Sequence, residues 1–286
     1  MNVKWIAKRT SHELIGKYCP DRKPDTHKGN YGRLLLICGA VGYTGAPYLA
    51  AQAALRSGAG LIFTGVPEAV YPIVAQKLHE PMVFPLADRD GKLSKRALPD
   101  ILEKLEKADA CLLGPGLGRS EELDEMVCEI IRRCKCPLVL DADGINAAAS
   151  HRNVLREAAC PIILTPHEGE YRRLTSGVEE DRVADTMTLA NELGVIVLRK
   201  GHVTLVTDGK RTYVNRTGNA GMATGGSGDV LAGVITALLG QGIPPLEAAA
   251  CAAWLHGAAG NLAAKKVGQY ALAPSDLIGE LSRLLP

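Results

Sequence analysis

Residues 225–235 read Gly-Gly-Ser-Gly-Asp-Val-Leu-Ala-Gly-Val-Ile, a glycine-rich turn and an aspartate that lead straight into an apolar run. The apolar residues fall on several faces of the helix that we predict over 228–239, so this helix should be buried. A buried helix N-terminus presents unpaired N–H groups and a positive dipole end. A phosphate group would satisfy both. The alternative is a plain turn in which Ser227 or Asp229 only caps the helix.

Upstream of this stretch, short apolar runs alternate with glycine-rich turns and helix-like segments. The runs are apolar on both faces, as in a parallel sheet that helices cover on each side. We therefore predict an α/β fold with a central, mostly parallel sheet and helices on both faces. The predicted strands are 33–38, 61–65, 110–114, 137–141, 161–165 and 194–198, and the predicted helices are 47–57, 67–79, 121–133, 144–150, 168–174 and 181–192.

After Lys200 the pattern changes. Two short strands, 202–207 and 211–214, flank Asp208-Gly209, which is a strong hairpin signal. Two long helices follow, over 228–239 and 245–265. Because no linker, repeat or low-complexity stretch interrupts the chain, we predict a single domain over 1–286.

Composition excludes several classes of function. Lys and Arg number 33 against 31 Asp and Glu, and aromatic residues make up 4% of the chain. Neither nucleic-acid binding nor base stacking is favoured by these values. No run reaches the ~20 apolar residues of a membrane span, and the N-terminus does not resemble a signal peptide. The 8 cysteines are scattered among apolar residues. They predict reduced thiols and a cytoplasmic protein.

Two nucleotide-binding fingerprints are not met. The chain contains no Walker A sequence, which excludes a P-loop enzyme. The loop Gly114-Pro115-Gly116-Leu117-Gly118 has its third glycine one residue too early for a dinucleotide-binding turn. This loop still allows the backbone to approach a ligand closely.

Ligands of open α/β sheets bind beyond the carboxyl ends of the strands, so the loops after the predicted strands should face one crevice. Asp141 and Asp143 suit Mg²⁺ or a substrate hydroxyl there, although a capping turn is equally consistent. His167 could donate to a ligand oxygen and Glu170 could hold metal-bound water, whereas a structural role is the commoner one for a lone histidine. We predict that His256, on the alanine-rich helix, is a packed core residue.

Asp229 and Lys200 are the candidate reactive groups. Asp229 could take a proton from a substrate hydroxyl, but burial would raise its pKa while the helix N-terminus would lower it. Lys200 could meet a phosphate, or it could be an ordinary surface lysine. The small residues of the loop 39–46 leave space for a flat ring or a ribose, or else for close helix–strand packing.

Taken together, these loops resemble one family. Gly225–Asp229 is similar to the anion hole of ribokinase-like enzymes, which implies their three-layer fold. The segments 28–32, 39–46, 56–61, 114–118, 141–144, 165–170 and 219–224 resemble the ADP/ATP-dependent NAD(P)H-hydrate dehydratases, the carbohydrate-kinase-like domain of the YjeF type. The resemblance runs from about Lys28 to Asp276.

The resemblance implies repair of NADH or NADPH hydrated at the nicotinamide ring (the S epimer of NADHX or NADPHX), driven by ADP or ATP with Mg²⁺. Asp229 matches the catalytic aspartate, which also contacts the hydrate. The positions matching the hydrate site are Ala46, Gly116 and His167. The positions matching or adjoining the nucleotide site are Lys200, Gly201, His202, Val203, Thr204, Asn219, Thr224, Gly225, Gly226, Ser227 and Gly228. Asp141, Asp143 and Glu170 are the metal candidates.

The resemblance also implies a homotetramer, ADP as the donor, and a separate NAD(P)H-hydrate epimerase as a functional partner, since the chain has no room for a fused one. Two alternatives stay open. A small-molecule kinase of the same superfamily, acting on hydroxymethylpyrimidine or hydroxyethylthiazole, would share the glycine-rich turn. A nucleotide-binding protein without turnover would share it as well.

Overall fold

The computed structural model describes residues 7–175 and 180–286. Within them, ten strands form one sheet in the order β1-β12-β11-β10-β9-β8-β7-β2-β3-β4. Seven neighbouring strands, from β10 to β4, pair in parallel, whereas β11 is antiparallel to both β10 and β12. The strands are β1 (Ala7–Arg9), β2 (Arg33–Ile37), β3 (Leu61–Pro67), β4 (Met82–Leu86), β7 (Ala110–Leu113), β8 (Leu138–Leu140), β9 (Ile162–Leu164), β10 (Ile196–Arg199), β11 (Thr204–Thr207) and β12 (Thr212–Asn215), with β5 (Asp88–Arg89) and β6 (Lys92–Leu93) as a separate hairpin.

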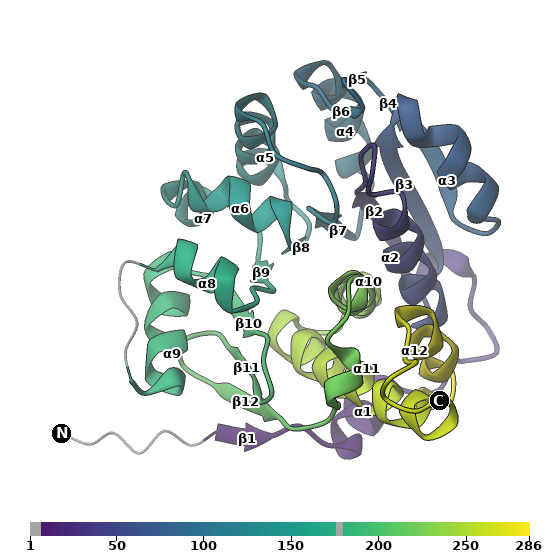
Figure 1. Ribbon diagram of the computed structural model, residues 1–286, viewed down its shortest axis with the longest axis vertical. Helices are drawn as coiled ribbons and strands as arrows, with labels where there is room; N and C mark the ends of the chain where they lie inside the picture. The colour runs from purple at the N-terminus through teal and green to yellow at the C-terminus, as the bar shows by residue number, and fades with distance from the viewer. Residues whose placement is uncertain (1–6, 176–179) are drawn as a thin grey trace.

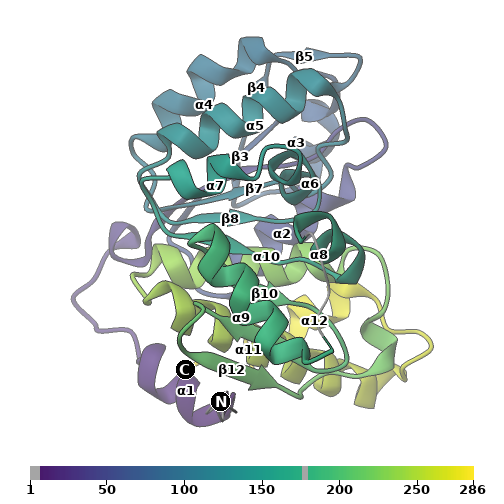
Figure 2. The ribbon, with the colours of Figure 1, turned by 90° about the vertical axis from the view of Figure 1, so that its left-hand side faces the viewer.

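Helices cover both faces of the sheet (Figure 1). One hydrophobic cluster joins the sheet to α1, α2, α3, α10, α11 and α12, and a second joins it to α4 through α9, the helices in front in Figure 2. The predicted three-layer α/β fold is therefore confirmed. The helices are α1 (His12–Tyr18), α2 (Gly45–Arg56), α3 (Tyr71–Lys77), α4 (Leu98–Leu105), α5 (Glu121–Arg133), α6 (Asp143–Ala149), α7 (Asn153–Glu157), α8 (Glu168–Leu174), α9 (Arg182–Leu193), α10 (Ser227–Gly240), α11 (Pro245–Val267) and α12 (Pro274–Leu281). Short 3₁₀ turns are η1 (Lys28–Tyr31), η2 (Glu68–Val70), η3 (Lys95–Ala97) and η4 (Ala220–Met222).

Helices α5 and α10 differ in how their apolar residues are distributed, and therefore in how much of each helix is buried. Ser120 caps α5 by accepting a hydrogen bond from the Leu123 amide, and the first turn is acidic while the last is basic. Its apolar residues form one stripe, so one face packs on the sheet and the other meets solvent. Helix α10 is instead buried on nearly every face from Val230 to Leu239. The buried helix predicted at 228–239 is confirmed.

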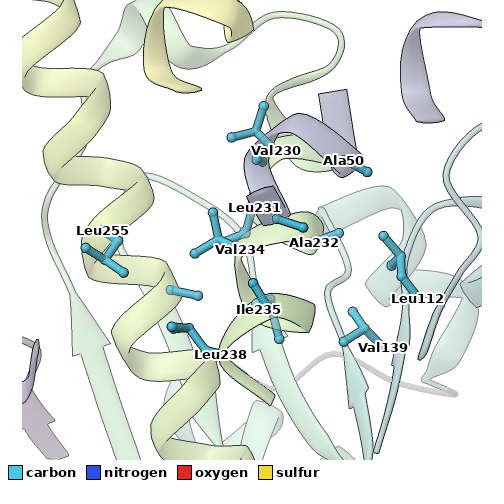
Figure 3. Close-up of a cluster of buried hydrophobic side chains, with 14 of the residues drawn as sticks. Ala50, Leu112, Val139, Val230, Leu231, Ala232, Val234, Ile235, Leu238 and Leu255 are labelled. Atoms are coloured by element: carbon cyan, nitrogen blue, oxygen red, sulfur yellow. The ribbon is translucent and has the colours of Figure 1, made fainter. Parts of the chain in front are cut away.

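Helix α10 lies at the centre of its layer, between α2, α11 and the strands (Figures 1 and 3). Val234 and Leu238 lie toward Leu255 of α11, while Leu112 of β7 and Val139 of β8 line the sheet side of the cluster. Helices α10 and α2 approach so closely that a Cβ at Gly233 would lie 2.2 Å from the Ala50 carbonyl oxygen. The glycine at 233 thus sets the separation of the two helices.

We predict that Gly233→Val lowers the free energy of unfolding by about 3 kcal/mol, because a side chain there collides with backbone and overpacks the core. Chemical denaturation measures the change. Gly279→Ala is the matched control: it places a Cβ into open space in helix α12 and should stabilise by about 0.5–1 kcal/mol. Equal stability of Gly233→Val and wild type would contradict the close packing.

The structure differs from the prediction in several segments. The helix predicted at 67–79 is wrong in its first part, because β3 continues to Pro67, a 3₁₀ turn follows, and α3 begins only at Tyr71. Pro72, in the first turn of α3, suits a helix start because its missing N–H would have no partner there. The sequence patterns also missed β1, α1, β4, the β5–β6 hairpin, α4, α7 and α12. The segment before Lys28 supplies β1, which pairs with β12, and α1, which packs on α11.

All eight cysteines are buried and free, as predicted. Cys134 ends α5 and Cys136 precedes β8, so the Cys-Lys-Cys sequence marks a helix end and a strand start. Across residues 7–175 and 180–286, no helix combines the length and the apolar character that crossing a membrane requires.

Candidate active site

Five loops meet at the carboxyl end of the parallel strands. The Gly39 amide, after β2, donates to the Pro115 carbonyl after β7 at 2.8 Å. The Gly118 amide donates to Asp143 Oδ2 after β8, also at 2.8 Å. The Lys200 amide, after β10, donates to the Pro166 carbonyl after β9 at 2.9 Å. These bonds join the loops predicted to face one crevice.

A cleft of about 1040 Å³ opens beside these loops. Its walls come from the loop after β10, the segment between β12 and α10, the first turn of α10 and one face of α11. Of the residues predicted for nucleotide binding, those that line it are Lys200, Gly201, His202, Thr204, Asn219, Thr224, Gly225, Ser227 and Gly228. Val203 and Gly226 do not line the cleft. The Val203 carbonyl accepts a hydrogen bond from Arg182, and Gly226 is the N-cap of α10.

The first turn of α10 faces the cleft. Gly226 is the N-cap, with φ +95°, and its left-handed backbone suits glycine. The Ser227 amide donates to the Thr224 carbonyl at 3.3 Å and the Val230 amide to the Gly226 carbonyl at 3.2 Å. Within the described residues the amides of Gly228 and Asp229 have no backbone acceptor. In the part of the chain that the structure describes, neither Ser227 nor Asp229 accepts from a first-turn amide, and the Ser227 hydroxyl meets His256 instead, so the alternative of a capping Ser227 or Asp229 is wrong.

Lys200 is held among carboxylates. Its Nζ lies 3.1 Å from Asp141 Oδ1 and 4.0 Å from Glu170 Oε2, and both acids are buried. Burial acts to lower the pKa of Lys200, but Asp141, Glu170 and Asp229 together raise it above its usual value. The Nζ also lies 3.3 Å from the point where a Cβ of Gly228 would sit. Lys200 is therefore a charged group at the helix N-terminus, and its reading as an ordinary surface lysine is wrong.

Asp229 has a pKa raised to about 7. Burial is the largest cause, Asp141 adds to the shift, Lys200 opposes it and Asp143 adds a little more. Burial therefore outweighs the influences that lower the pKa. A carboxyl group that titrates near neutral pH is well matched to accept a proton from a hydroxyl.

The three metal candidates do not converge. Asp141 Oδ1 accepts a hydrogen bond from Thr165 at 2.6 Å and pairs with Lys200. Asp143 accepts from Gly118, and Glu170 Oε2 accepts from the His167 amide at 2.9 Å. No group of three histidines, cysteines or acids in the described ranges could hold a metal ion. These residues therefore do not fit a resident metal held by the protein alone.

Between the two aspartates of this loop, Ala142 has φ +48°. A non-glycine residue in this region is strained, and such strain clusters at functional sites. Asp143 is the first residue of α6, and Ala142, which precedes it, makes no side-chain cap. The strained residue stands between Asp141, which pairs with Lys200, and Asp143, which begins the helix.

His167 is the N-cap of α8. Its Nδ1 accepts from the Gly169 amide at 2.9 Å and the Glu170 amide at 3.3 Å, and its Nε2 lies 3.3 Å from Glu170 Oε1. Burial raises the pKa of Glu170, against the opposing charge of Lys200. His167 thus has a structural role as a cap and also lines the cleft, with its side chain 56% exposed.

The other positions matched to the hydrate site lie in a different place. A Cβ at Gly116 would lie 3.1 Å from the Ala46 Cβ and 2.8 Å from the Tyr43 Cβ, so the loops after β2 and β7 touch there. Neither Ala46 nor Gly116 lines the large cleft. Asp229 raises the pKa of Cys38, just after β2, after the larger effect of burial. Asp229, in the first turn of α10, therefore also lies near the loop that follows β2.

Sequence patterns missed two arginines that support the loop 200–204. Arg199 pairs with Asp185 at 2.7 Å and Glu168 at 2.9 Å, and its guanidinium lies 3.5 Å from the centre of the Tyr171 ring. Arg182, the first residue of α9, donates to the carbonyls of Val203 and Lys200. The second of these bonds is 2.9 Å long. One guanidinium thus fixes the start and the end of the loop.

We predict that Arg182→Ala frees this loop. Amide hydrogen exchange of residues 201–204 should accelerate about tenfold, since a charge-assisted hydrogen bond to each end is lost. Mass spectrometry of the exchanging protein measures the effect. Arg152→Ala, which removes a surface pair with Glu192, is the control and should leave the loop unchanged. Unchanged exchange in Arg182→Ala would contradict the assigned support.

Residues 34–283 match the family model of NAD(P)H-hydrate dehydratase. A bifunctional NAD(P)H-hydrate repair enzyme of Moorella thermoacetica is 44% identical over 93% of this chain and 51% of its own length. An ADP-dependent (S)-NAD(P)H-hydrate dehydratase of Neisseria meningitidis is 37% identical over 91% of this chain and 86% of its own length.

Among solved structures, the ADP/ATP-dependent NAD(P)H-hydrate dehydratase of Bacillus subtilis, co-crystallised with ATP and Mg²⁺, has a TM-score of 0.81. It is 28% identical, and the match covers 97% of each chain. The present chain spans about half the length of the bifunctional relatives that it matches. Because the family model matches residues 34–283, which is most of the chain, the chain belongs to the NAD(P)H-hydrate dehydratase family.

Proposed function

We propose that this protein dehydrates the S epimer of NADHX or NADPHX to NADH or NADPH, and that it consumes ADP, or ATP, in doing so. The observation that carries this proposal is Asp229, a carboxyl with a pKa of about 7 at the start of α10. It lies beside unpaired helix amides and the Lys200 ammonium. A base next to an anion site suits transfer of a phosphoryl group to a hydroxyl.

The nucleotide would occupy the cleft of about 1040 Å³. Its transferring phosphate would lie at the first turn of α10, where the Gly228 and Asp229 amides donate and Lys200 supplies positive charge. The loop 200–204 and the segment that contains Asn219 would hold the rest of the nucleotide. The fit of cleft size and donor placement supports this assignment.

The hydrate would bind next to Asp229, against Ala46 and Gly116, which do not line the cleft. Ala46 and Gly116 are small and the loops that carry them lie close together, so the nicotinamide ring would lie against this pair. His167 would reach the hydrate from the α8 side. In this arrangement the ring hydroxyl would lie within reach of both Asp229 and the terminal phosphate, as phosphoryl transfer requires.

The chemistry balances in two steps. Asp229 takes the proton of the ring hydroxyl, whose oxygen attacks the terminal phosphorus of ADP while the bond to the AMP oxygen breaks. The ring C–O bond then breaks, phosphate leaves, the neighbouring carbon loses a proton and the ring double bond forms. Hydroxide is a poor leaving group and phosphate is a good one, so the first step makes the second possible. The α10 amides stabilise charge on the phosphoryl group in transfer.

We propose that Mg²⁺ enters with the nucleotide. The described carboxylates do not form a cage, and Mg²⁺ usually binds through phosphates and water with one or two acids. Asp141 or Asp143 would then contact the ion through water. We also propose a single domain over the described residues and a cytoplasmic location, which the eight free thiols support. An NAD(P)H-hydrate epimerase would supply the S epimer.

The test measures near-UV absorbance of reduced nicotinamide after purified protein receives NADHX, Mg²⁺ and either ADP or ATP. Recovery that requires nucleotide and releases one phosphate per NADH formed would support the proposal, and the better nucleotide would identify the donor. A phosphorylated product that accumulates without elimination would indicate a kinase. Protein that binds ADP but recovers no NADH with either nucleotide would exclude the dehydratase.

A further inference from the structure

His256 of α11, which was predicted to be a packed core residue, instead lines the cleft and forms a hydrogen bond to α10. Its Nε2 lies 2.9 Å from the Ser227 carbonyl oxygen and 3.2 Å from Ser227 Oγ. Ser227 is the first residue of α10, and both residues line the cleft. The side chain therefore joins the middle of α11 to the first turn of α10.

The proton on this histidine is fixed by its partner. A carbonyl oxygen only accepts hydrogen bonds, so Nε2 must carry the proton. Burial lowers the pKa of His256 to about 4, against the favourable contact with Ser227, and the nearby Lys200 lowers it further. The ring is therefore neutral near pH 7, and its one N–H is committed to α10.

This contact acts on the peptide group between Ser227 and Gly228. The group is planar and trans, so the Ser227 carbonyl and the Gly228 N–H point in opposite directions. Gly226 and Gly228 lack Cβ atoms on either side of Ser227, so this helix start is less constrained by its own side chains than most. A donor that holds the Ser227 carbonyl therefore also fixes the orientation of the Gly228 amide, which has no backbone acceptor among the described residues and lines the cleft.

We infer that His256 is a positioning residue: through the Ser227 carbonyl it fixes the Gly228 amide for a nucleotide phosphate. This inference rests on the proposed nucleotide site at α10. It extends that site to a residue outside the glycine-rich turn, 28 positions later than Gly228 in the chain. Helix α11 thus contributes more than the wall of the cleft.

Other residues of α11 than His256 pack against α10 and hold the segment before it. Leu255, the preceding residue, is fully buried and lies on the side of α11 that faces the core of α10 (Figure 3). Asn219 donates to the Gly260 carbonyl at 3.0 Å, so α11 also holds the segment before α10 one turn later. Packing and positioning are therefore carried by different residues of α11.

The experiment compares nucleotide binding by three variants of the full chain. His256→Leu keeps an apolar side chain and removes the N–H, while His256→Gln places an amide N–H near the position of Nε2. Cys251→Ala is the control, because it is buried in α11 and does not line the cleft. Calorimetry with ADP and Mg²⁺ gives the Kd, and circular dichroism on heating gives the Tm.

We expect His256→Leu to raise the Kd for ADP about tenfold, the effect of one lost buried hydrogen bond. His256→Gln should recover most of the affinity, and Cys251→Ala should lower the Tm without changing the Kd. If the wild type turns over NADHX, kcat should fall in His256→Leu as well, since the same amide would hold the phosphoryl group in transfer.

Three results would overturn the inference. Folded His256→Leu with wild-type affinity would show that the contact has no effect on nucleotide. Equal losses in His256→Leu and His256→Gln would assign the effect to ring shape, and an equal loss in Cys251→Ala would assign it to α11 stability. Because the readout is ADP binding, a wild type that binds ADP without dehydrating NADHX would refute the proposed reaction and leave this test intact.

Discussion

Asp229→Asn should lower kcat for NADHX repair about 10³-fold, within the range that a positioned general base contributes. The amide keeps the shape and the polarity of the side chain but cannot accept the hydroxyl proton. Binding of ADP should change little, because the α10 amides and Lys200 remain. Stopped-flow absorbance and calorimetry measure the two quantities. A kcat within tenfold of wild type would remove Asp229 from the catalytic role.

The same residue sets a pH profile. A pKa of about 7 means that Asp229 is protonated and inactive as a base at lower pH. The second-order rate constant kcat/KM of the wild type should therefore fall about tenfold per pH unit below pH 7 and level off above it. Asp124→Asn, which changes a partly buried acid on α5, should keep this profile. A flat wild-type profile from pH 5 to 8 would contradict the assigned base.

The free energy of unfolding should fall as pH rises, whereas kcat/KM rises. The folded pKa of Asp229 lies above its unfolded value of 3.8, so the folded state holds the proton more tightly between about pH 4 and pH 7. The free energy of unfolding therefore declines as pH rises through this window. Asp229→Asn removes the buried charge and should be more stable than wild type at pH 8 by a few kcal/mol, since one pKa unit is about 1.4 kcal/mol.

Lys200→Met should weaken both folding and binding. It leaves Asp141 and Glu170 buried without their counter-charge, which should lower the free energy of unfolding by about 3 kcal/mol at pH 7. It also removes a charged donor from the phosphate position, so the Kd for ADP should rise about 10- to 100-fold. Denaturant titration and calorimetry give the two values.

A second substitution separates the two effects. The double variant Asp141→Asn with Lys200→Met removes one of the two unpaired charges and keeps an oxygen for the Thr165 hydroxyl. About half of the lost stability should return, while the affinity for ADP stays low. Recovery of affinity together with stability would show that Lys200 acts on nucleotide only through the fold.

The sequence predicted the parts of this fold that carry regular patterns. Apolar runs with glycine after them gave the parallel strands, and the predicted bounds of α5 and α8 agree with the structure. Strand β4 was missed because Met82, Phe84 and Pro85 give it neither a clean alternation nor a buried run. Pro85 also breaks the expected strand composition, yet it is tolerated because β4 lies at the edge of the sheet.

The site was predicted in part for a similar reason. Asp141 and Lys200 follow strands and Asp229 follows a glycine-rich turn at a helix start, so their places in the sequence made them candidates. His256 and Arg182 could not, because each acts from a helix distant in sequence and donates to backbone carbonyls. A carbonyl has no signature in the sequence, so such contacts appear only once the chain is folded.

The eight buried thiols can report local or global unfolding of the protein through their alkylation. An alkylating reagent in water can reach a buried sulfur only after local or global unfolding. Cys38 directly follows β2 and belongs to the hydrophobic cluster that contains α10. Cys128 lies on α5 and belongs to the cluster on the opposite face of the sheet. Mass analysis of timed labelling would thus give separate opening rates for the two layers, without any introduced probe.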